Sequence, residues 1–350
     1  MDKTALDFLQ KLLATPTPSG WEKAGQDLVA EYMEPYADRV DRDVHGNVHG
    51  VLNAEAPCRV LLCGHCDEIG LMVQHIDDKG FLYVSALGGV NVPLLPAERV
   101  VFQGRNGPVH GVLGVLPIHL MSKEEREKAP KIHDLWVDIG AKNRKDAERV
   151  IALGDVGTID TGWIKLRNGL VACRGFDDRI GAFVVADVLR LLKDKDLNVA
   201  VHAVSTVQEE IGLRGARTAA LKVDPHIGIA VDVGFGTDYP KMNEKIVGTA
   251  DLGKGPVLHR GPTFNHRLLD LLQKTAKSGK IKTQMQPEPR GANTDAYAIQ
   301  MTRAGVAAGL ISIPTRYIHS PVETIALKDA TNTVKLLAEL IASLTGREKL

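Results

Sequence analysis

The sequence predicts an α/β protein whose mixed, largely parallel sheet is flanked by helices and interrupted by an inserted β-rich domain. Apolar runs and amphipathic segments alternate at both ends of the 350-residue chain, a pattern typical of a helix-covered parallel sheet. The middle instead has closely spaced β runs and turns. The length fits roughly two domains. We expect a catalytic domain formed by residues 1–70 and 165–350, and an inserted domain at 71–164.

The first part of the α/β domain is expected to begin with two helices. The first is amphipathic and runs from about Ala5 to Ala14. A hairpin-like stretch, "RVDRDVHGNVHGVLN", follows the second helix, and the apolar strand "CRVLLCGH" ends at His65.

The inserted segment has the turn signals of antiparallel hairpins. Two β runs flank Asp78-Lys79-Gly80, and a second hairpin surrounds Asn106-Gly107. Short strands are predicted at 135–139 and 155–160. The charged stretches "SKEEREK" and "KNRKDAERV" predict short helices.

After residue 165 the alternation of helices and strands returns. The stretch "FDDRIGAFVVADVLRLLK" has apolar residues at i, i+3 and i+4, which predicts a long helix. Because helices separate the strands that follow, the sheet should be largely parallel. The predicted strands are 199–207, 226–234 and 306–314, and the other helices are 214–222, 265–277, 293–300 and 328–344.

Charge and composition exclude several classes of partner. The formal net charge is 0 and no long run of like charge appears, which argues against nucleic acid or an acidic membrane as a partner. No 18-residue apolar segment predicts a membrane span. The N-terminus is too charged for a signal peptide. With only four cysteines, a disulfide scaffold is not expected, and we predict a reducing, cytoplasmic location.

Two adjacent glutamates, Glu209 and Glu210, directly follow the apolar run that ends at Val207. Their carboxylates repel each other, and each costs several kcal/mol to bury without a partner. The pair therefore either points into solvent or is held by positive charge.

Other polar residues follow apolar runs in the same way: His65 and Asp67, Asp232, and His319, while Asp177 begins the long helix. Because the carboxyl ends of parallel strands meet at one sheet edge, we expect these side chains to lie close together. Each also has an ordinary alternative, such as a structural hydrogen bond for a histidine, a helix cap for Asp177 or a turn cap for Asp232.

Two imidazoles and three carboxylates are ligands that suit zinc, cobalt or manganese. Five ligands are too many for one catalytic zinc ion, but they suit two ions that share a carboxylate. Successive side chains of an extended segment point in opposite directions, so one glutamate of the pair can bind metal while its neighbour acts as general base. Asp67 can orient the imidazole of His65.

At these positions the sequence resembles a known family, the co-catalytic metallo-aminopeptidases of the tetrahedral type. That family includes glutamyl aminopeptidases and members once labelled endoglucanases. The similarity covers essentially the whole chain, and the ordered set of motifs is highly specific. The motifs are "GHCDEIG", "FDDRIGA", "VQEEIGLRGA", "AVDVG", "GKGP", "NTDA" and "PTRYIHSPVE".

The resemblance implies two divalent metal ions per subunit, zinc foremost, with cobalt or manganese as alternatives. By motif position, His65 and Asp232 would bind one ion, Glu210 and His319 the other, and Asp177 would bridge them. The ions would activate water for the removal of N-terminal residues from peptides with a free N-terminus.

The resemblance also implies that Glu209 is the general base and that Asp67 supports His65. It implies a phosphorylase/hydrolase-like fold with a PDZ-like dimerisation insert, and homodimers that build a homododecamer. Three positions depart from the family pattern, namely Cys66, Asn293 and Ser312. They leave the preferred N-terminal residue open, and "PEPRGANTDAY" is a candidate lining of the substrate pocket.

Several alternatives remain at this stage. A glycosidase would use paired carboxylates without metal; a deacylase or carboxypeptidase would share the metal core; a metal-stabilised assembly would have no turnover. The pair Cys63 and Cys66 straddles a strand end, which disfavours a redox pair, and no serine-centred elbow is present. The glycines of "GGVNVPLLP" lack the spacing of a phosphate-binding loop.

Overall fold

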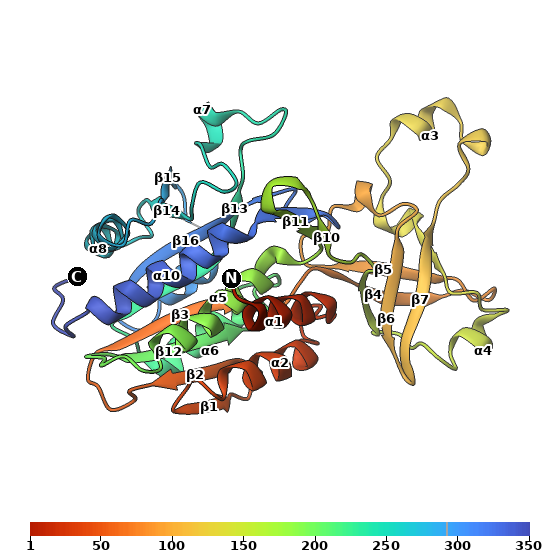
Figure 1. Cartoon of the computed structure of the whole chain (residues 1–350). Helices are drawn as coiled ribbons and strands as arrows, with labels where there is room; N and C mark the ends of the chain where they lie inside the picture. The colour runs from red at the N-terminus through yellow and green to blue at the C-terminus, as the bar shows by residue number, and fades with distance from the viewer. Residues whose placement is uncertain (292) are drawn as a thin grey trace.

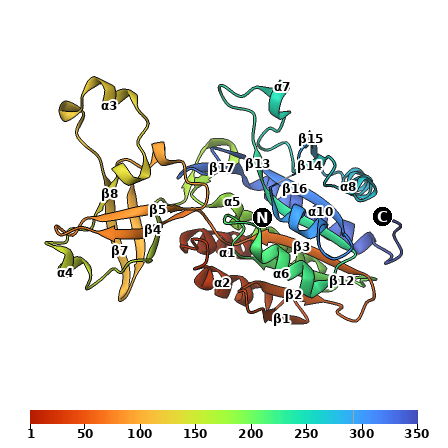
Figure 2. The same cartoon turned by 180° about the vertical axis from the view of Figure 1, so that it is seen from behind.

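The computed structural model describes residues 1–291 and 293–350, in which an eleven-stranded sheet covered by helices lies beside a closed six-stranded barrel (Figure 1). The view from behind shows the same two bodies (Figure 2). The helices are α1 (Lys3–Ala14), α2 (Lys23–Met33), α3 (Lys123–Glu127), α4 (Arg144–Ala147), α5 (Phe176–Leu192), α6 (Arg214–Val223), α7 (Glu244–Val247), α8 (His266–Ser278), α9 (Asp295–Gln300) and α10 (Leu327–Ser343). The strands of the sheet are β1 (Arg39–Arg42), β2 (Val48–Leu52), β3 (Arg59–His65), β10 (Ile164–Lys165), β11 (Leu170–Cys173), β12 (Ala200–Thr206), β13 (Ile227–Phe235), β14 (Val257–Arg260), β15 (Gln284–Pro287), β16 (Ala307–Arg316) and β17 (Glu323–Ala326). The strands of the barrel are β4 (Gly70–Ile76), β5 (Leu82–Leu87), β6 (Arg99–Gly104), β7 (Gly107–Gly114), β8 (Trp136–Asp138) and β9 (Val156–Ile159).

The sheet is mixed, with its parallel pairs at the centre. Its strand order is β1-β2-β12-β3-β13-β16-β17-β11-β10, and β14 adds to β16 and carries β15. Parallel ladders join β12 to β3, β3 to β13 and β13 to β16 at the centre, a further parallel ladder joins β15 to β14, and the remaining ladders are antiparallel. The predicted mixed α/β fold is therefore confirmed, and the parallel strands are those on which the polar residues converge.

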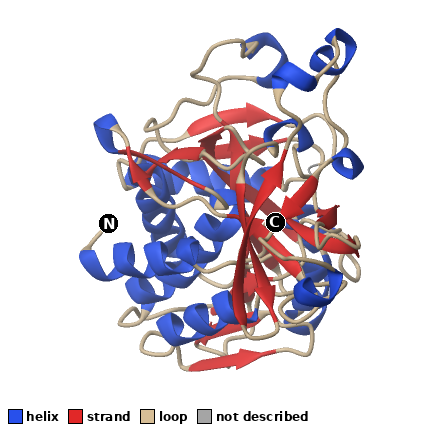
Figure 3. Ribbon diagram, turned by 90° about the vertical axis from the view of Figure 1, so that its right-hand side faces the viewer, coloured by secondary structure: helices blue, strands red, loops and turns tan. Residues whose placement is uncertain are grey.

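Helices cover both faces of the central strands (Figure 3). Helices α1, α2, α5 and α10 pack on one face, and α6 and α9 on the other. Alternate residues of β3 enter different cores: Val60 and Leu62 face the first layer, whereas Leu61 and Cys63 face the second. Burial on both faces explains why this strand is a continuous apolar run in the sequence.

The barrel closes in the order β4-β5-β8-β7-β6-β9, and its strands pair antiparallel. Its two hairpins turn at the predicted places, because Gly80 donates to Asp77 after β4 and Gly104 pairs with Gly107 across the second turn. Val84 and Phe102 contribute to its own apolar core. Helix α3 stands on a long loop that projects from the barrel (Figure 1).

The structure also contains short strands that the sequence did not predict, namely β10, β11, β14, β15 and β17. Each has four residues or fewer, and β11 pairs with β17 from the far end of the chain. Runs this short carry no measurable period, so only their distant partners define them. Helix α4 covers only Arg144–Ala147 of the predicted 142–150. In the described part of the chain, no helix combines the length and apolarity needed to cross a bilayer.

Candidate metal centre

One edge of the sheet gathers the predicted site residues. His65 is the last residue of β3, and Asp232 lies in the neighbouring β13. Glu209 and Glu210 follow β12, on the other side of β3, and His319 follows β16. Parallel register keeps these ends level, since His65 pairs with Thr206 at the end of β12. The carboxyl ends of parallel strands thus meet here, as expected for a ligand site in an α/β sheet.

The side chains form two groups of potential metal ligands. The first ligand group comprises His65, Glu209 and Asp232, and the second comprises Asp177, Glu210 and His319. Within each group, the ligand atoms all lie within 4.8 Å of one another. The sequence had separated Glu209 from the ligands as a base, whereas its carboxylate lies as close to His65 and Asp232 as a ligand would.

Asp177 lies between the two imidazoles. Its Oδ1 is 3.3 Å from Nε2 of His65, and its Oδ2 is 3.3 Å from Nε2 of His319. The alternative role of a helix cap belongs instead to its neighbour, because Asp178 accepts a hydrogen bond from the amide of Gly181 at 3.0 Å. The Asp177 carboxylate therefore faces both ligand groups with one oxygen each.

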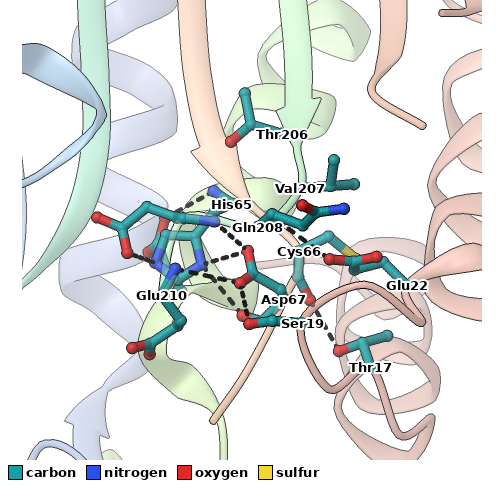
Figure 4. Close-up of polar contacts among 12 residues, drawn as sticks. Thr17, Ser19, Glu22, His65, Cys66, Asp67, Thr206, Val207, Gln208 and Glu210 are labelled. Carbon is teal, nitrogen blue, oxygen red and sulfur yellow. Dashed lines mark hydrogen bonds and ion pairs between the residues drawn. The ribbon is translucent and has the colours of Figure 1, made fainter. Parts of the chain in front are cut away.

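Asp67 is fully buried and binds the backbone of both glutamates. Figure 4 shows its carboxylate close to Ser19, His65 and Glu210. Its carboxylate accepts hydrogen bonds from the amides of Glu209 (2.9 Å) and Glu210 (3.2 Å), and from the hydroxyl of Ser19 (2.5 Å). Nδ1 of His65 lies 3.0 Å from the backbone oxygen of Asp67 and 3.3 Å from its carboxylate. A carbonyl oxygen can only accept, so Nδ1 carries the proton and Nε2 turns toward the ligand groups.

Three buried acids outside the predicted set also support the site. The carboxylate of Glu22 accepts hydrogen bonds from the backbone amides of Gly20 (2.7 Å) and Gln208 (3.1 Å), and it thereby holds the turn just before Glu209 (Figure 4). Asp295 accepts the hydroxyl of Thr206 at 2.6 Å.

The third of these acids is Glu323. One of its carboxylate oxygens accepts a hydrogen bond from the amide of Asp177, and the other accepts one from the amide of His319, each at 3.0 Å. Sequence reasoning missed these acids because each binds a group from a distant segment: Glu22 the amide of Gln208, Asp295 the hydroxyl of Thr206, and Glu323 the amide of Asp177. Two motifs carried a signal, since "NTDA" contains Asp295 and "PTRYIHSPVE" places Glu323 four residues after His319.

The charge balance of the site favours cations. Burial, reinforced by the charge of Asp177, raises the pKa of Asp232 well above its ordinary value, and burial raises the pKa of Glu209 to about 10. Hydrogen bonds to Asp177 and Glu210 raise the pKa of His319 to about 11. The carboxylates thus exceed the two imidazoles in number, and divalent ions would let them ionise together.

The surroundings shift the pKa values of His65 and Asp177 in opposite directions. Burial by itself lowers the pKa of His65, but the charges of Glu209, Asp177 and Asp67 raise it well above its ordinary value. Burial also opposes ionisation of Asp177, yet hydrogen bonds from His319 and His65 lower its pKa. Asp177 is accordingly the carboxylate that stays charged between the two groups.

A cavity of about 850 Å³ opens onto both ligand groups. The predicted lining segment borders it through Pro287, Glu288, Pro289, Arg290, Asn293 and Thr294, while Ala292 lies outside the described residues. Two of the positions that depart from the family pattern, Asn293 and Ser312, also line it. Cys66 is buried instead, and all four cysteines are free thiols.

Comparison with known proteins gives consistent matches. A family profile described as M42 glutamyl aminopeptidase matches residues 46–336. The chain is similar to a lysyl aminopeptidase of Pyrococcus furiosus, with 39% identity over 342 residues that cover 97% of each chain. It is also similar to the crystal structure of a TET aminopeptidase from the marine sediment archaeon Thaumarchaeota archaeon SCGC AB-539-E09, with a TM-score of 0.93 and 36% identity over 97% of this chain and 96% of that one.

Two further solved structures match over nearly their full length. The TET1 peptidase of Pyrococcus horikoshii, described as able to assemble into a tetrahedron or a large octahedral shell, has a TM-score of 0.87 and 31% identity over 97% of this chain and all 100% of that one. A Thermotoga maritima structure named endoglucanase has a TM-score of 0.77 and 28% identity, covering 95% and 96% of the two chains.

Proposed function

The chain belongs to the M42 family of glutamyl aminopeptidases, and from this premise we propose that it is a two-metal enzyme that removes N-terminal residues from peptides. Family membership makes it a peptide hydrolase of the aminopeptidase type, and it confirms the resemblance seen in the motifs. The metal ions, the residue roles and the assembly are our proposals.

One observation carries the proposal: Asp177 presents one oxygen to His65 and the other to His319, each 3.3 Å from Nε2. A carboxylate in this position suits a ligand shared by two ions. The donor set fits borderline divalent metals, since it combines imidazole nitrogen with carboxylate oxygen. Oε1 of Glu210 is buried, and its partner among the described residues is Nε2 of His319 at 3.3 Å, so a cation between these two atoms would have both as ligands.

We assign His65 and Asp232 to one ion, Glu210 and His319 to the other, and Asp177 to both. Zinc is the first candidate, with cobalt or manganese as alternatives. When bound, the ions would supply Lewis-acid activation of water and of the peptide carbonyl.

Side chains of the protein would carry out the proton transfer. We assign Glu209 as the general base, which takes a proton from the attacking water onto its carboxylate and returns it to the leaving amine. In the protein without ions, burial raises the pKa of Glu209 to about 10 and keeps its carboxyl protonated at neutral pH; bound cations would lower this pKa and free the carboxylate to act as base. Asp67 fixes the backbone of Glu209 and, with its own carbonyl, the ring of His65.

For assembly, we propose that residues 71–164 form a PDZ-like dimerisation domain and that dimers build a homododecamer. The barrel and its projecting loop expose the apolar side chains of Val112, Ile118 and Leu120, as an interface between subunits requires. The assembly described for the Pyrococcus horikoshii relative supports the same extension. We further propose that the enzyme acts in the cytoplasm.

Metal dependence is tested by chelation and reloading. We expect the metal-free protein to be inactive on aminoacyl anilides and zinc, cobalt or manganese to restore turnover. Substrates with an acetylated α-amine serve as controls and should not be cleaved. Activity that survives chelation, cleavage of glycans, or equal cleavage of blocked and free peptides would point to the glycosidase or deacylase alternatives.

The role of Glu209 is tested by Glu209→Gln, which keeps the size of the side chain but removes the base. Turnover should fall by roughly 10²–10⁴-fold while two metal equivalents remain bound. Glu148→Gln, an exposed carboxylate on the barrel, is the control and should be unaffected. Loss of one metal equivalent in Glu209→Gln would instead make Glu209 a ligand of the first group.

A further inference from the structure

A pair of glycines in the barrel approaches the second ligand group. Gly88 and Gly89 directly follow β5, whose last residue, Leu87, pairs with Gly70 in β4. The amide of Val90 donates to the carbonyl of Gly88 at 3.0 Å, which tightens the turn after the strand. These glycines belong to "GGVNVPLLP", a motif to which the proposed chemistry assigns no role.

Gly89 binds the imidazole of His319 directly. Nδ1 of His319 lies 2.8 Å from the carbonyl oxygen of Gly89, while Nε2 of the same ring lies 3.3 Å from oxygens of both Asp177 and Glu210. Because the carbonyl can only accept, Nδ1 must carry its proton, and Nε2 is the nitrogen left for a metal ion. One contact thus sets both the tautomer and the direction of the ring.

The backbone of His319 also needs external support. Its φ of +59° is in the left-handed region, which a residue with a side chain adopts only when its surroundings hold it there. Glu323 accepts its amide at 3.0 Å from within the sheet domain. The barrel therefore supplies the contact to the ring, and the sheet domain supplies the contact to the backbone.

Gly89 leaves no room for a side chain, and Gly88 leaves little. A Cβ on Gly89 would lie 2.7 Å from Nδ1 and from Cε1 of His319. A Cβ on Gly88 would lie 3.3 Å from Cβ of Glu210. Gly89 has no positive φ, so it is steric closeness to His319, and not backbone conformation, that requires glycine there.

We infer that Gly89 is a positioning residue, through which the barrel orients His319 and sets the affinity of the second ligand group for its metal ion. The barrel is then part of the metal centre as well as a candidate interface. The inference rests on the proposed metal-dependent function.

The test is Gly89→Ala, compared with Gly162→Ala as the matched control. Gly162 also lies in the inserted segment and has no positive φ, and a Cβ added to it would have no described atom within 4 Å, so the methyl group meets no neighbour. Zinc binding to the metal-free full chain is measured by competition with a chromophoric chelator. We expect Gly89→Ala to weaken one of two binding steps by roughly 10–100-fold, as for other outer contacts to metal-bound histidines. Gly162→Ala should match wild type.

A double-mutant cycle with His319→Ala shows whether Gly89 acts through the ring. In that background, Gly89→Ala should cause no further loss of zinc affinity. Equal losses in both backgrounds, or wild-type affinity of Gly89→Ala, would overturn the inference. If Gly89→Ala does not fold, the double variant decides: recovery of the wild-type melting temperature supports a clash with the ring, and failure to recover argues against it.

The same data separate this inference from the proposed function. If His319→Ala loses one zinc equivalent but Gly89→Ala does not, only the positioning role of Gly89 is wrong. If wild type binds no zinc, or His319→Ala binds as wild type does, the metal assignment itself fails and the inference fails with it.

Discussion

Replacing Glu68 by glutamine should destabilise the protein far more than a surface neutralisation of the same kind. Glu68 accepts hydrogen bonds from Arg174 (2.6 Å), Arg179 (3.0 Å) and the amide of Thr17 (2.9 Å). The side chains of Glu68, Arg174 and Arg179 are only 3%, 8% and 0% exposed. Glu68→Gln keeps the volume but leaves two buried guanidinium groups with no carboxylate within 4 Å among the described residues.

The expected cost follows from this burial. Removing one partner of a buried ion pair costs about 3–5 kcal/mol, because the remaining charge stays desolvated. Unfolding entropy of roughly 2.1 cal/mol/K per residue gives about 0.7 kcal/mol/K for 350 residues. The melting temperature should therefore fall by about 4–7 °C.

Asp27→Asn is the matched control. Asp27 also contacts two cations, Lys23 and Arg42, each at 2.7 Å, but its side chain is 49% exposed. Exposed pairs of this kind contribute only about 0.2–1 kcal/mol each, so the loss of both should lower the melting temperature by about 0.5–3 °C.

The assay is thermal unfolding of the metal-free proteins followed by circular dichroism, repeated with urea. Hydrogen bonds and charge from Arg174 and Arg179 lower the pKa of Glu68 below its ordinary 4.5, although burial opposes this. The stabilisation is then complete above pH 4.5 and is lost as the pH falls below it. The difference between wild type and Glu68→Gln should shrink accordingly in acid. Equal shifts for Glu68→Gln and Asp27→Asn at pH 7 would refute the reasoning.

Three further predictions concern packing, metal removal and a buried hydroxyl. Gly64→Ala places a Cβ 2.3 Å from the backbone carbon of Gly181, so β3 and α5 must separate. We expect the free energy of unfolding, measured with urea, to fall by about 3 kcal/mol or more, and an unchanged midpoint urea concentration would contradict this. Because burial raises the pKa of Glu209 to about 10, the folded metal-free protein holds more protons than the unfolded chain above pH 4.5, and its melting temperature should fall from pH 5 to 9. If the melting temperature depends on pH in the same way with and without zinc, the idea is wrong. Tyr32→Phe removes a 2.6 Å hydrogen bond to Asp187 and should cost about 1–2 kcal/mol in thermal unfolding; a wild-type melting curve would show that the bond contributes nothing.

The predicted elements succeeded where local pattern and tertiary environment agree. The continuous apolar run of β3 signalled a strand buried on both faces, and the turn around Asn106 signalled the hairpin of β6 and β7. The strand-end rule brought His65, Asp232 and His319 to one edge, because parallel strands align their carboxyl ends.

Contacts between distant segments could not be predicted in this way. Ser19, Glu22 and Glu323 bind Asp67, Gln208 and Asp177, which lie far away in the chain, and a single polar residue in a turn has many ordinary explanations. Alternation along the strand likewise predicts that the two glutamates diverge but not which ligand each one meets, so only the family resemblance assigned Glu210 to the metal and Glu209 as base.

The sequence alone determined the α/β class, the two hairpins and the set of residues that converge at the sheet edge. These features follow from periodicity and turn chemistry, which are local properties of the chain. The family resemblance implied a bridging Asp177, but only the tertiary structure placed its two oxygens 3.3 Å from the two imidazoles and brought Gly89 of the barrel against the ring of His319. These are distances between segments brought together by packing, and the order of residues along a chain does not encode them locally.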